Sequence, residues 1–61
     1  MITNKTLTKS EEIIKEYFCA GFAAEEISKR LRIPYFAIIE SRYNIIKKGY
    51  ELPELKEEQY L

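Results

Sequence analysis

Residues 24–48 read "AEEISKRLRIPYFAIIESRYNIIKK", and this pattern predicts two helices joined by a tight turn. Ala24, Ile27 and Leu31 recur at helical spacing with charged residues between them, which predicts a helix over 24–31. Acidic residues lie at the start of this segment and basic residues at its end, which is the arrangement that the helix dipole favours. Two helices of this length and separation are typical of a helix-turn-helix.

The second helix of this stretch is predicted over 35–48, and it is apolar on two sides. Pro34 suits either the turn or the first helical position, because it lacks only a backbone donor that would be unpaired there. At about 100° per residue, Ile38 and Ile45 fall on one side, which is needed to fill a core. The opposite side carries Phe36, Ile39 and Tyr43, with Glu40 among them.

A further helix is predicted over 9–20, ahead of this pair. Thr8 and Glu11 have the spacing of a capping box, in which each side chain accepts a hydrogen bond from the other residue's backbone. Gly21 is placed to end the helix in a left-handed conformation. Cys19 is expected to be a small buried or half-buried hydrophobic residue. The apolar set of this helix is Ile13, Ile14, Tyr17 and Phe18.

These elements predict an all-α fold, a compact domain of three or four helices that contains a helix-turn-helix. No segment has the alternation of a strand. Residues 7–50 are expected to form the domain, after a disordered N-terminus over 1–6. Residues 51–61 are acidic and are expected to form either a C-terminal helix or a tail. Because a chain of 61 residues has room for only one small core, association with another chain is the expected extra source of stability.

Charge is unevenly distributed along the chain, although its ten bases and ten acids cancel. Residues 1–50 carry nine bases and six acids, a net charge of +3. Residues 51–61 carry one base and four acids, a net charge of −3. A mildly basic body is a weak electrostatic footprint for a nucleic-acid binder, since such proteins usually concentrate base on one face.

The residue types present argue against catalysis and against a bound metal. There is no His, the single Cys19 cannot form an internal disulfide, and no Gly-rich phosphate loop occurs. We therefore expect no enzyme activity, no cofactor, no metal and no small-molecule ligand. No apolar run approaches the roughly 18–20 residues that cross a bilayer, and no signal peptide follows Met1. A cytoplasmic protein without a membrane partner is expected.

Residues 7–48 contain "LT" with Glu11, then "AGFAAEEISKRL", "RIPYFAII" and Asn44-Ile45, at spacings that can be aligned without a gap. In this register they resemble the DNA-binding domain of LuxR-type response regulators and, more loosely, region four of sigma factors. The resemblance implies a three- or four-helix domain that binds double-stranded DNA as a homodimer and regulates transcription. The fourth helix of the family, which often serves dimerisation, would fall on 53–60.

The resemblance also implies which residues would meet DNA. Helix 35–48 would enter the major groove, with Tyr35, Phe36, Ile39, Glu40 and Tyr43 facing the bases. Arg42, Lys47 and Lys48 would reach phosphates. The basic residues clustered at the turn are further candidates for phosphate binding: Lys29, Arg30 and Arg32. The chain departs from the family here, because groove-facing positions are commonly polar or basic. Four of these five are Phe, Ile or Tyr, and Glu40 would repel the DNA backbone.

Three explanations stay open for the second apolar side of helix 35–48. It could belong to the core, with residues 51–61 folded across it, or it could face DNA, with 51–61 packed elsewhere as a fourth helix. It could instead bind protein, since aromatic residues with a few charges make good interface anchors. The chain would then be an accessory regulator, of the kind phages and other mobile elements often encode, that binds a repressor, a sigma factor or a polymerase subunit. The candidate protein interface is Phe36, Ile39, Tyr43, Leu52, Leu55 and Tyr60.

Overall fold

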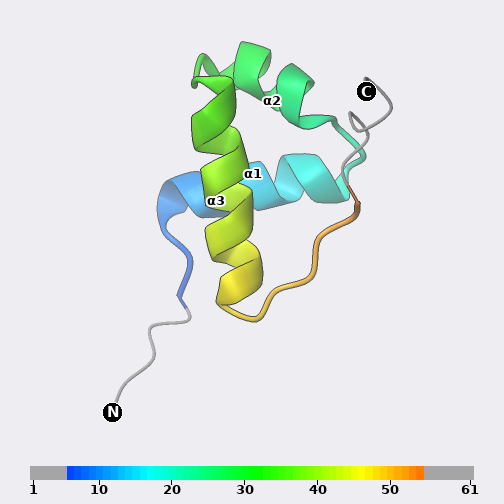
Figure 1. The fold of residues 1–61 in the computed structure, drawn as a ribbon. Coiled ribbons are helices and arrows are strands. Elements are labelled where there is room, and N and C mark those ends of the chain that lie inside the picture. Colours follow the sequence, from blue (N-terminus) through cyan, green and yellow to red (C-terminus); the bar gives the residue numbers. More distant parts are fainter. Residues whose placement is uncertain (1–5, 55–61) are drawn as a thin grey trace.

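The computed structural model describes residues 6–54 and shows three helices with short connections (Figure 1). They are α1 (Lys9–Cys19), α2 (Ala24–Leu31) and α3 (Tyr35–Lys47). Each bound lies within one residue of the prediction, and residues 6–54 contain no strand. The all-α prediction is therefore confirmed.

Two predicted end segments fall largely outside the described residues. Of the N-terminal segment expected to be disordered, only Thr6 is described. Of the segment expected to be a fourth helix or a tail, residues 51–54 are described and are not helical. Leu55 and Tyr60, named above as interface candidates, lie outside the described part of the chain.

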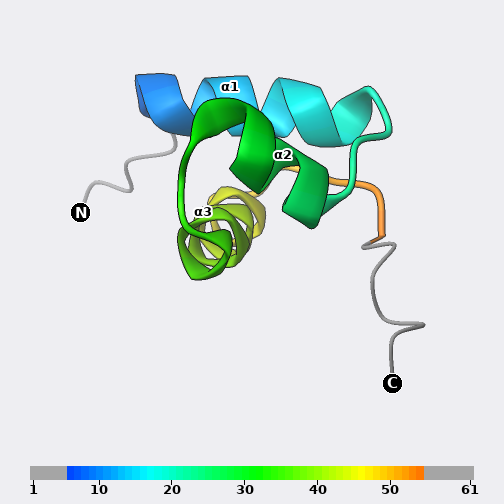
Figure 2. The same cartoon turned by 90° about the horizontal axis from the view of Figure 1, so that it is seen from above.

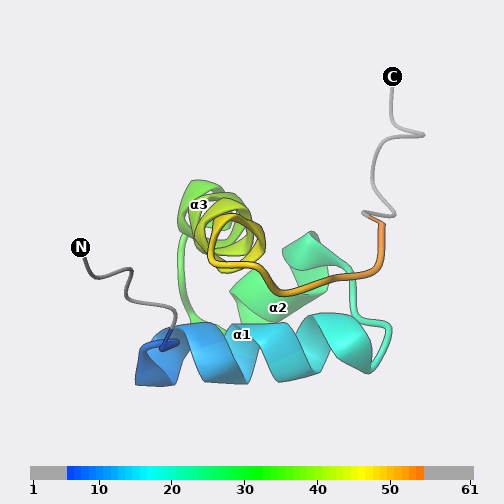
Figure 3. The same cartoon turned by 90° about the horizontal axis from the view of Figure 1, so that it is seen from below.

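Helix α3 crosses α1 and packs on α1 and α2 with one side only. Figure 1 shows α3 running across α1, with α2 near the N-terminal end of α3. The views along α3 in Figures 2 and 3 show α1 and α2 on one side of it and open space on the other. After α3 the chain turns back past α2 toward the C-terminal end of α1, away from that free side (Figure 3).

The start of α1 is fixed by the predicted capping box. The Glu11 N–H donates to Thr8 Oγ1 over 3.2 Å, and the Thr8 N–H donates to Glu11 Oε1 over 3.0 Å. These two bonds occupy backbone donors that the first turn of a helix would otherwise leave unpaired. The capping prediction is confirmed.

All three helices end in the same way, with one residue in the left-handed region. These residues are Gly21 (φ 100°), Arg32 (φ 60°) and Gly49 (φ 105°). In each case the next residue's N–H reaches back five positions to a carbonyl of the last turn, which pairs a helix-end acceptor. The three bonds are Phe22 to Tyr17 at 3.0 Å, Ile33 to Ser28 at 3.1 Å and Tyr50 to Ile45 at 3.3 Å.

Replacing Arg32 by glycine is expected to raise the free energy of unfolding by about 0.5–1 kcal/mol. A residue with a Cβ destabilises the folded chain by about 1–2 kcal/mol when it is left-handed, and glycine removes this strain. Glycine also has more conformational freedom in the unfolded chain, which offsets part of the stabilisation. Arg32→Ala is the control, because it removes the exposed side chain and keeps the strain. Urea denaturation that ranked Arg32→Gly no higher than Arg32→Ala would contradict the explanation.

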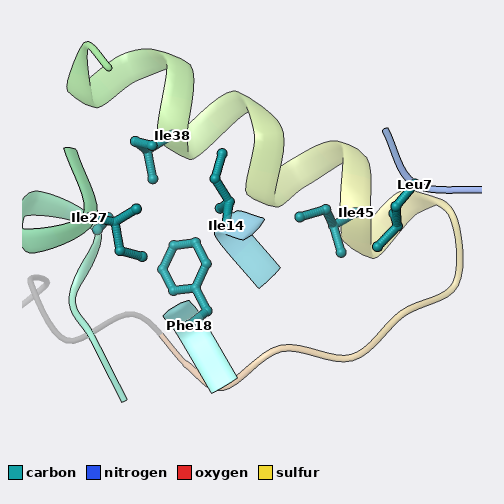
Figure 4. Close-up of a cluster of buried hydrophobic side chains, with 7 residues drawn as sticks. Leu7, Ile14, Phe18, Ile27, Ile38 and Ile45 are labelled. Atoms are coloured by element: carbon teal, nitrogen blue, oxygen red, sulfur yellow. The ribbon is translucent and has the colours of Figure 1, made fainter. Parts of the chain in front are cut away.

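The core lies where the three helices meet, and isoleucines dominate it. Ile14, Ile27, Ile38 and Ile45 are almost completely buried, one or two from each helix. Figure 4 shows Ile14 and the Phe18 ring between Ile27 and Ile38 at one end and Ile45 at the other. Leu7, Phe18 and Ala24 complete the buried set. The prediction that Ile38 and Ile45 form the core side of their helix is confirmed.

An ion pair joins the start of α1 to the end of α3. The Lys48 Nζ lies 2.7 Å from Glu11 Oε1 and also donates to the Thr6 carbonyl over 3.2 Å. The Glu11 and Lys48 side chains are only 11% and 22% exposed, so salt screens this pair weakly. The hydrogen bond from Lys48, and then that from the Thr8 N–H, lower the pKa of the Glu11 carboxyl below its ordinary value. The Glu11 carboxylate therefore both caps the start of α1 and links α1 to the end of α3.

The prediction for Cys19 is wrong, because its thiol is exposed. Cys19 is the last residue of α1, and the side that faces the core there belongs to Phe18. Helical spacing gave Cys19 no core position, and only its residue type suggested burial.

Candidate interaction surface on helix α3

The free side of α3 is predominantly apolar. Phe36 is 71% exposed and Tyr43 is 62% exposed, and they lie seven residues apart on the side of α3 opposite the core. Tyr35 and Ile46, toward the flank, are each a little under half exposed. Ile39 is half-buried and also packs against the core. We call Tyr35, Phe36, Ile39, Glu40, Tyr43, Ile46 and Lys47 together the α3 outer face.

The described part of the C-terminal segment does not cover this face. Leu52 is half-buried and packs against the core, and Pro53 accepts a hydrogen bond from Arg42. Neither contact covers Phe36 or Tyr43, which stay exposed. Within residues 6–54, the explanation of this apolar side as core is therefore wrong for Phe36 and Tyr43 and holds in part for Ile39.

One acid and one base lie within the α3 outer face. Glu40 and Lys47 are both exposed and are separated by seven residues, or two helical turns. The Lys47 Nζ lies 5.6 Å from the centre of the Tyr43 ring, which places the cation over an aromatic face. The outer face therefore has no net charge.

Two bases expected to reach phosphates are bound within the subunit instead. The Arg42 guanidinium lies 4.9 Å from the centre of the Phe18 ring and donates to the Pro53 carbonyl, and its side chain is half-buried. The Lys48 ammonium is paired with Glu11. Moving either group to DNA would break these contacts. Of the three basic candidates on α3 and its cap, only Lys47 is exposed and has no hydrogen bond or ion pair within residues 6–54, although its ammonium lies over the Tyr43 ring.

The bases at the turn are divided in the same way. Arg30 pairs with Glu26 over 3.3 Å, and its guanidinium lies 4.8 Å from the centre of the Phe22 ring. Lys29 and Arg32 are exposed, and neither has a hydrogen bond or ion pair within residues 6–54. Of the six basic candidates, three could therefore bind an anion without breaking a hydrogen bond or ion pair within residues 6–54: Lys29, Arg32 and Lys47.

A second, smaller apolar surface lies on the outer side of α1, and the sequence pattern did not single it out. Ile13 is 43% exposed, and the rings of Tyr17 and Phe22 meet edge to face with centroids 5.1 Å apart. The spacing of Ile13 and Tyr17 at i and i+4 was the available signal, but it was indistinguishable from that of core residues. A shallow hollow there is lined by Ile13, Glu16, Tyr17, Ala20 and Phe22.

The described residues supply no group that would hold a metal ion. Among residues 6–54, no three His, Cys, Asp or Glu side chains lie close enough together to do so. The one carboxyl in that range whose pKa is clearly shifted, Glu11, is engaged in the ion pair of the fold. No helix among them is both long enough and apolar enough to cross a membrane.

Comparison with known proteins gives no relative. No protein-family model matches the chain, and neither a curated protein nor a solved structure matches it significantly.

Proposed function

We propose that this chain is an accessory regulator of transcription that acts by binding protein through the α3 outer face. The exposure of Phe36 and Tyr43 on the free side of α3 is the observation that carries the proposal. The helix-turn-helix resemblance supplies the connection to transcription, and α2, a short turn and α3 follow one another as that motif requires. Its partner in this role would be a repressor, a sigma factor or a polymerase subunit.

The chemistry of the face favours protein over DNA as its target. Full burial of one large apolar side chain contributes about 1.5–3 kcal/mol, so two or three anchors on this face suffice for a specific contact. Base edges are read mainly by polar and basic side chains, and at these positions Phe36 and Ile39 could contact only thymine methyl groups. Glu40 would add repulsion from the phosphates.

Double-stranded DNA is the second candidate target, because the side of α3 that does not pack on α1 and α2 is free (Figure 2). Lys29, Arg32 and Lys47 would then bind phosphates, and a homodimer would place two α3 helices in successive major grooves. With three phosphates neutralised, the logarithm of the binding constant should fall with the logarithm of salt concentration with a slope of about −3. A slope near zero, or no binding at low salt, would exclude this candidate.

The proposed function is tested by affinity capture from host lysate, with and without nuclease, followed by identification of the captured proteins. We expect the wild type to capture a protein of the transcription apparatus both with and without nuclease. The Phe36→Ser variant should not capture it. Ile13→Ser is the matched control, because it removes an exposed apolar side chain from the α1 surface instead. Capture that depends on nucleic acid, or that is equal for both variants, would contradict the proposal.

A further inference from the structure

We infer that the α3 outer face binds a second copy of this chain, with the two α3 helices antiparallel about a two-fold axis beside Tyr43. The inference goes beyond the proposed function: both need this face to bind protein, but the partner here is a second copy of the chain. A two-fold interface requires a surface that is complementary to itself. The α3 outer face meets this requirement in its charges, its apolar residues and its area.

The charges of the face match only in the antiparallel arrangement. Glu40 lies three residues before Tyr43 and Lys47 four residues after it. Antiparallel helices that cross at Tyr43 therefore place Glu40 of each copy opposite Lys47 of the other, twice in the interface. Parallel helices in register would set Glu40 against Glu40 and Lys47 against Lys47, and like charges in contact oppose association.

The apolar residues follow the same register. Ile39 lies four residues before Tyr43 and Ile46 three residues after it, so each Ile39 faces Ile46 of the second copy. The two Tyr43 rings meet at the axis, where aromatic pairs stack favourably. Phe36, seven residues from Tyr43, extends to the end of the other copy's α3, near Tyr50. One crossing point thus pairs every apolar residue of the central part of the face.

The exposed area is sufficient for a dimer of ordinary size. The exposed fractions of four side chains give the apolar area of the face that is accessible to solvent: Tyr35, Phe36, Tyr43 and Ile46. Together they expose on the order of 400 Å². Stable interfaces bury about 800 Å² per partner and are only slightly more than half non-polar. The exposed apolar residues of the face therefore supply about the non-polar share of one such interface.

Self-association has a consequence for regulation. The dimer covers Phe36 and Tyr43, which a heterologous partner or a major groove would also need. Binding of such a target must therefore compete with dimerisation, and the apparent affinity for it should fall as the concentration of this chain rises.

Sedimentation equilibrium of the full chain and of Glu40→Lys, Lys47→Glu and the double variant tests the inference. We expect the wild type to dimerise, each single variant to raise the dimer dissociation constant at least tenfold, and the double variant to return to within about threefold of wild type. Both positions are exposed, so the variants should fold, and circular dichroism checks this. Four equal dissociation constants would exclude the antiparallel pairing.

A second variant separates this inference from the proposed function. Phe36→Ser should abolish dimerisation and also the capture of a transcription protein. A wild type that stays monomeric to about 1 mM overturns the inference, since the standard free energy of such an association would be weaker than about −4 kcal/mol. If that monomer still captures a transcription protein and Phe36→Ser does not, the proposed function stands without the dimer. If the wild type dimerises and captures none, the dimer stands without the proposed function.

Discussion

Replacing Ile38 by alanine is expected to lower the free energy of unfolding by about 2–4 kcal/mol. Its side chain is completely buried between α2 and α1, close to Ile27 and Ile14 (Figure 4). The loss combines the transfer of three methyl or methylene groups to water with the cavity left behind. Because a domain of this size is stable by only a few kcal/mol, most of the Ile38→Ala protein should be unfolded at 25 °C.

Ile46→Ala is the matched control for this prediction, since it makes the same change on the same helix. Ile46 is 45% exposed, so its replacement should cost less than about 1 kcal/mol. Urea denaturation followed by circular dichroism at 222 nm measures both variants, at a protein concentration low enough that the chain is monomeric. Equal losses of stability would mean that the buried and exposed sides of α3 have been assigned wrongly.

Replacing Glu11 by glutamine is expected to lower the free energy of unfolding by about 1–2 kcal/mol at pH 7, because hydrogen bonds to charged groups are stronger than neutral ones. Glutamine keeps the size of the side chain and an oxygen for the Thr8 N–H, so the loss comes mainly from the contact with Lys48. A double-mutant cycle with Lys48→Gln isolates that contact. A coupling energy near zero would show that the ion pair does not stabilise the fold.

The contribution of Glu11 should also depend on pH, with a sign fixed by its lowered pKa. The unfolded chain binds a proton at this carboxyl near the ordinary value of 4.5, and the folded chain only at lower pH. The stabilisation is therefore fully present above about pH 5 and is lost as the pH falls through the folded pKa. The difference in stability between wild type and Glu11→Gln should shrink over that range, and a difference that grew on acidification would contradict this account.

Much of the fold could be predicted from the sequence because local signals determine it. The Thr8–Glu11 spacing marks the start of α1, and Gly21 and Gly49 mark the ends of α1 and α3. The left-handed residue at the end of α2 was not predicted, because it is Arg32 and not a glycine. The tight turn between α2 and α3 holds Arg32 in a conformation that arginine seldom adopts, so residue preferences do not predict it.

The candidate site could be predicted only in part. The second apolar side of α3 was visible as a periodicity, but its exposure depends on where the rest of the chain runs. The roles of Arg42 and Lys48 depend on contacts with Phe18 and Glu11, which are 24 and 37 positions away along the chain, and a local pattern does not contain such contacts. Both bases looked available for phosphate binding for this reason.

Amide chemical-shift mapping of the labelled chain by NMR tests the central claim most directly, since it follows the α3 outer face in two titrations. Raising the protein concentration should shift the amides of Phe36, Ile39 and Tyr43, whereas adding a mixed-sequence DNA duplex at about 150 mM salt should not. Even non-specific DNA binding, with a dissociation constant of about 10⁻⁴–10⁻⁶ M, would be seen at these concentrations. Shifts of the same amides with duplex, and none with protein concentration, would contradict the account.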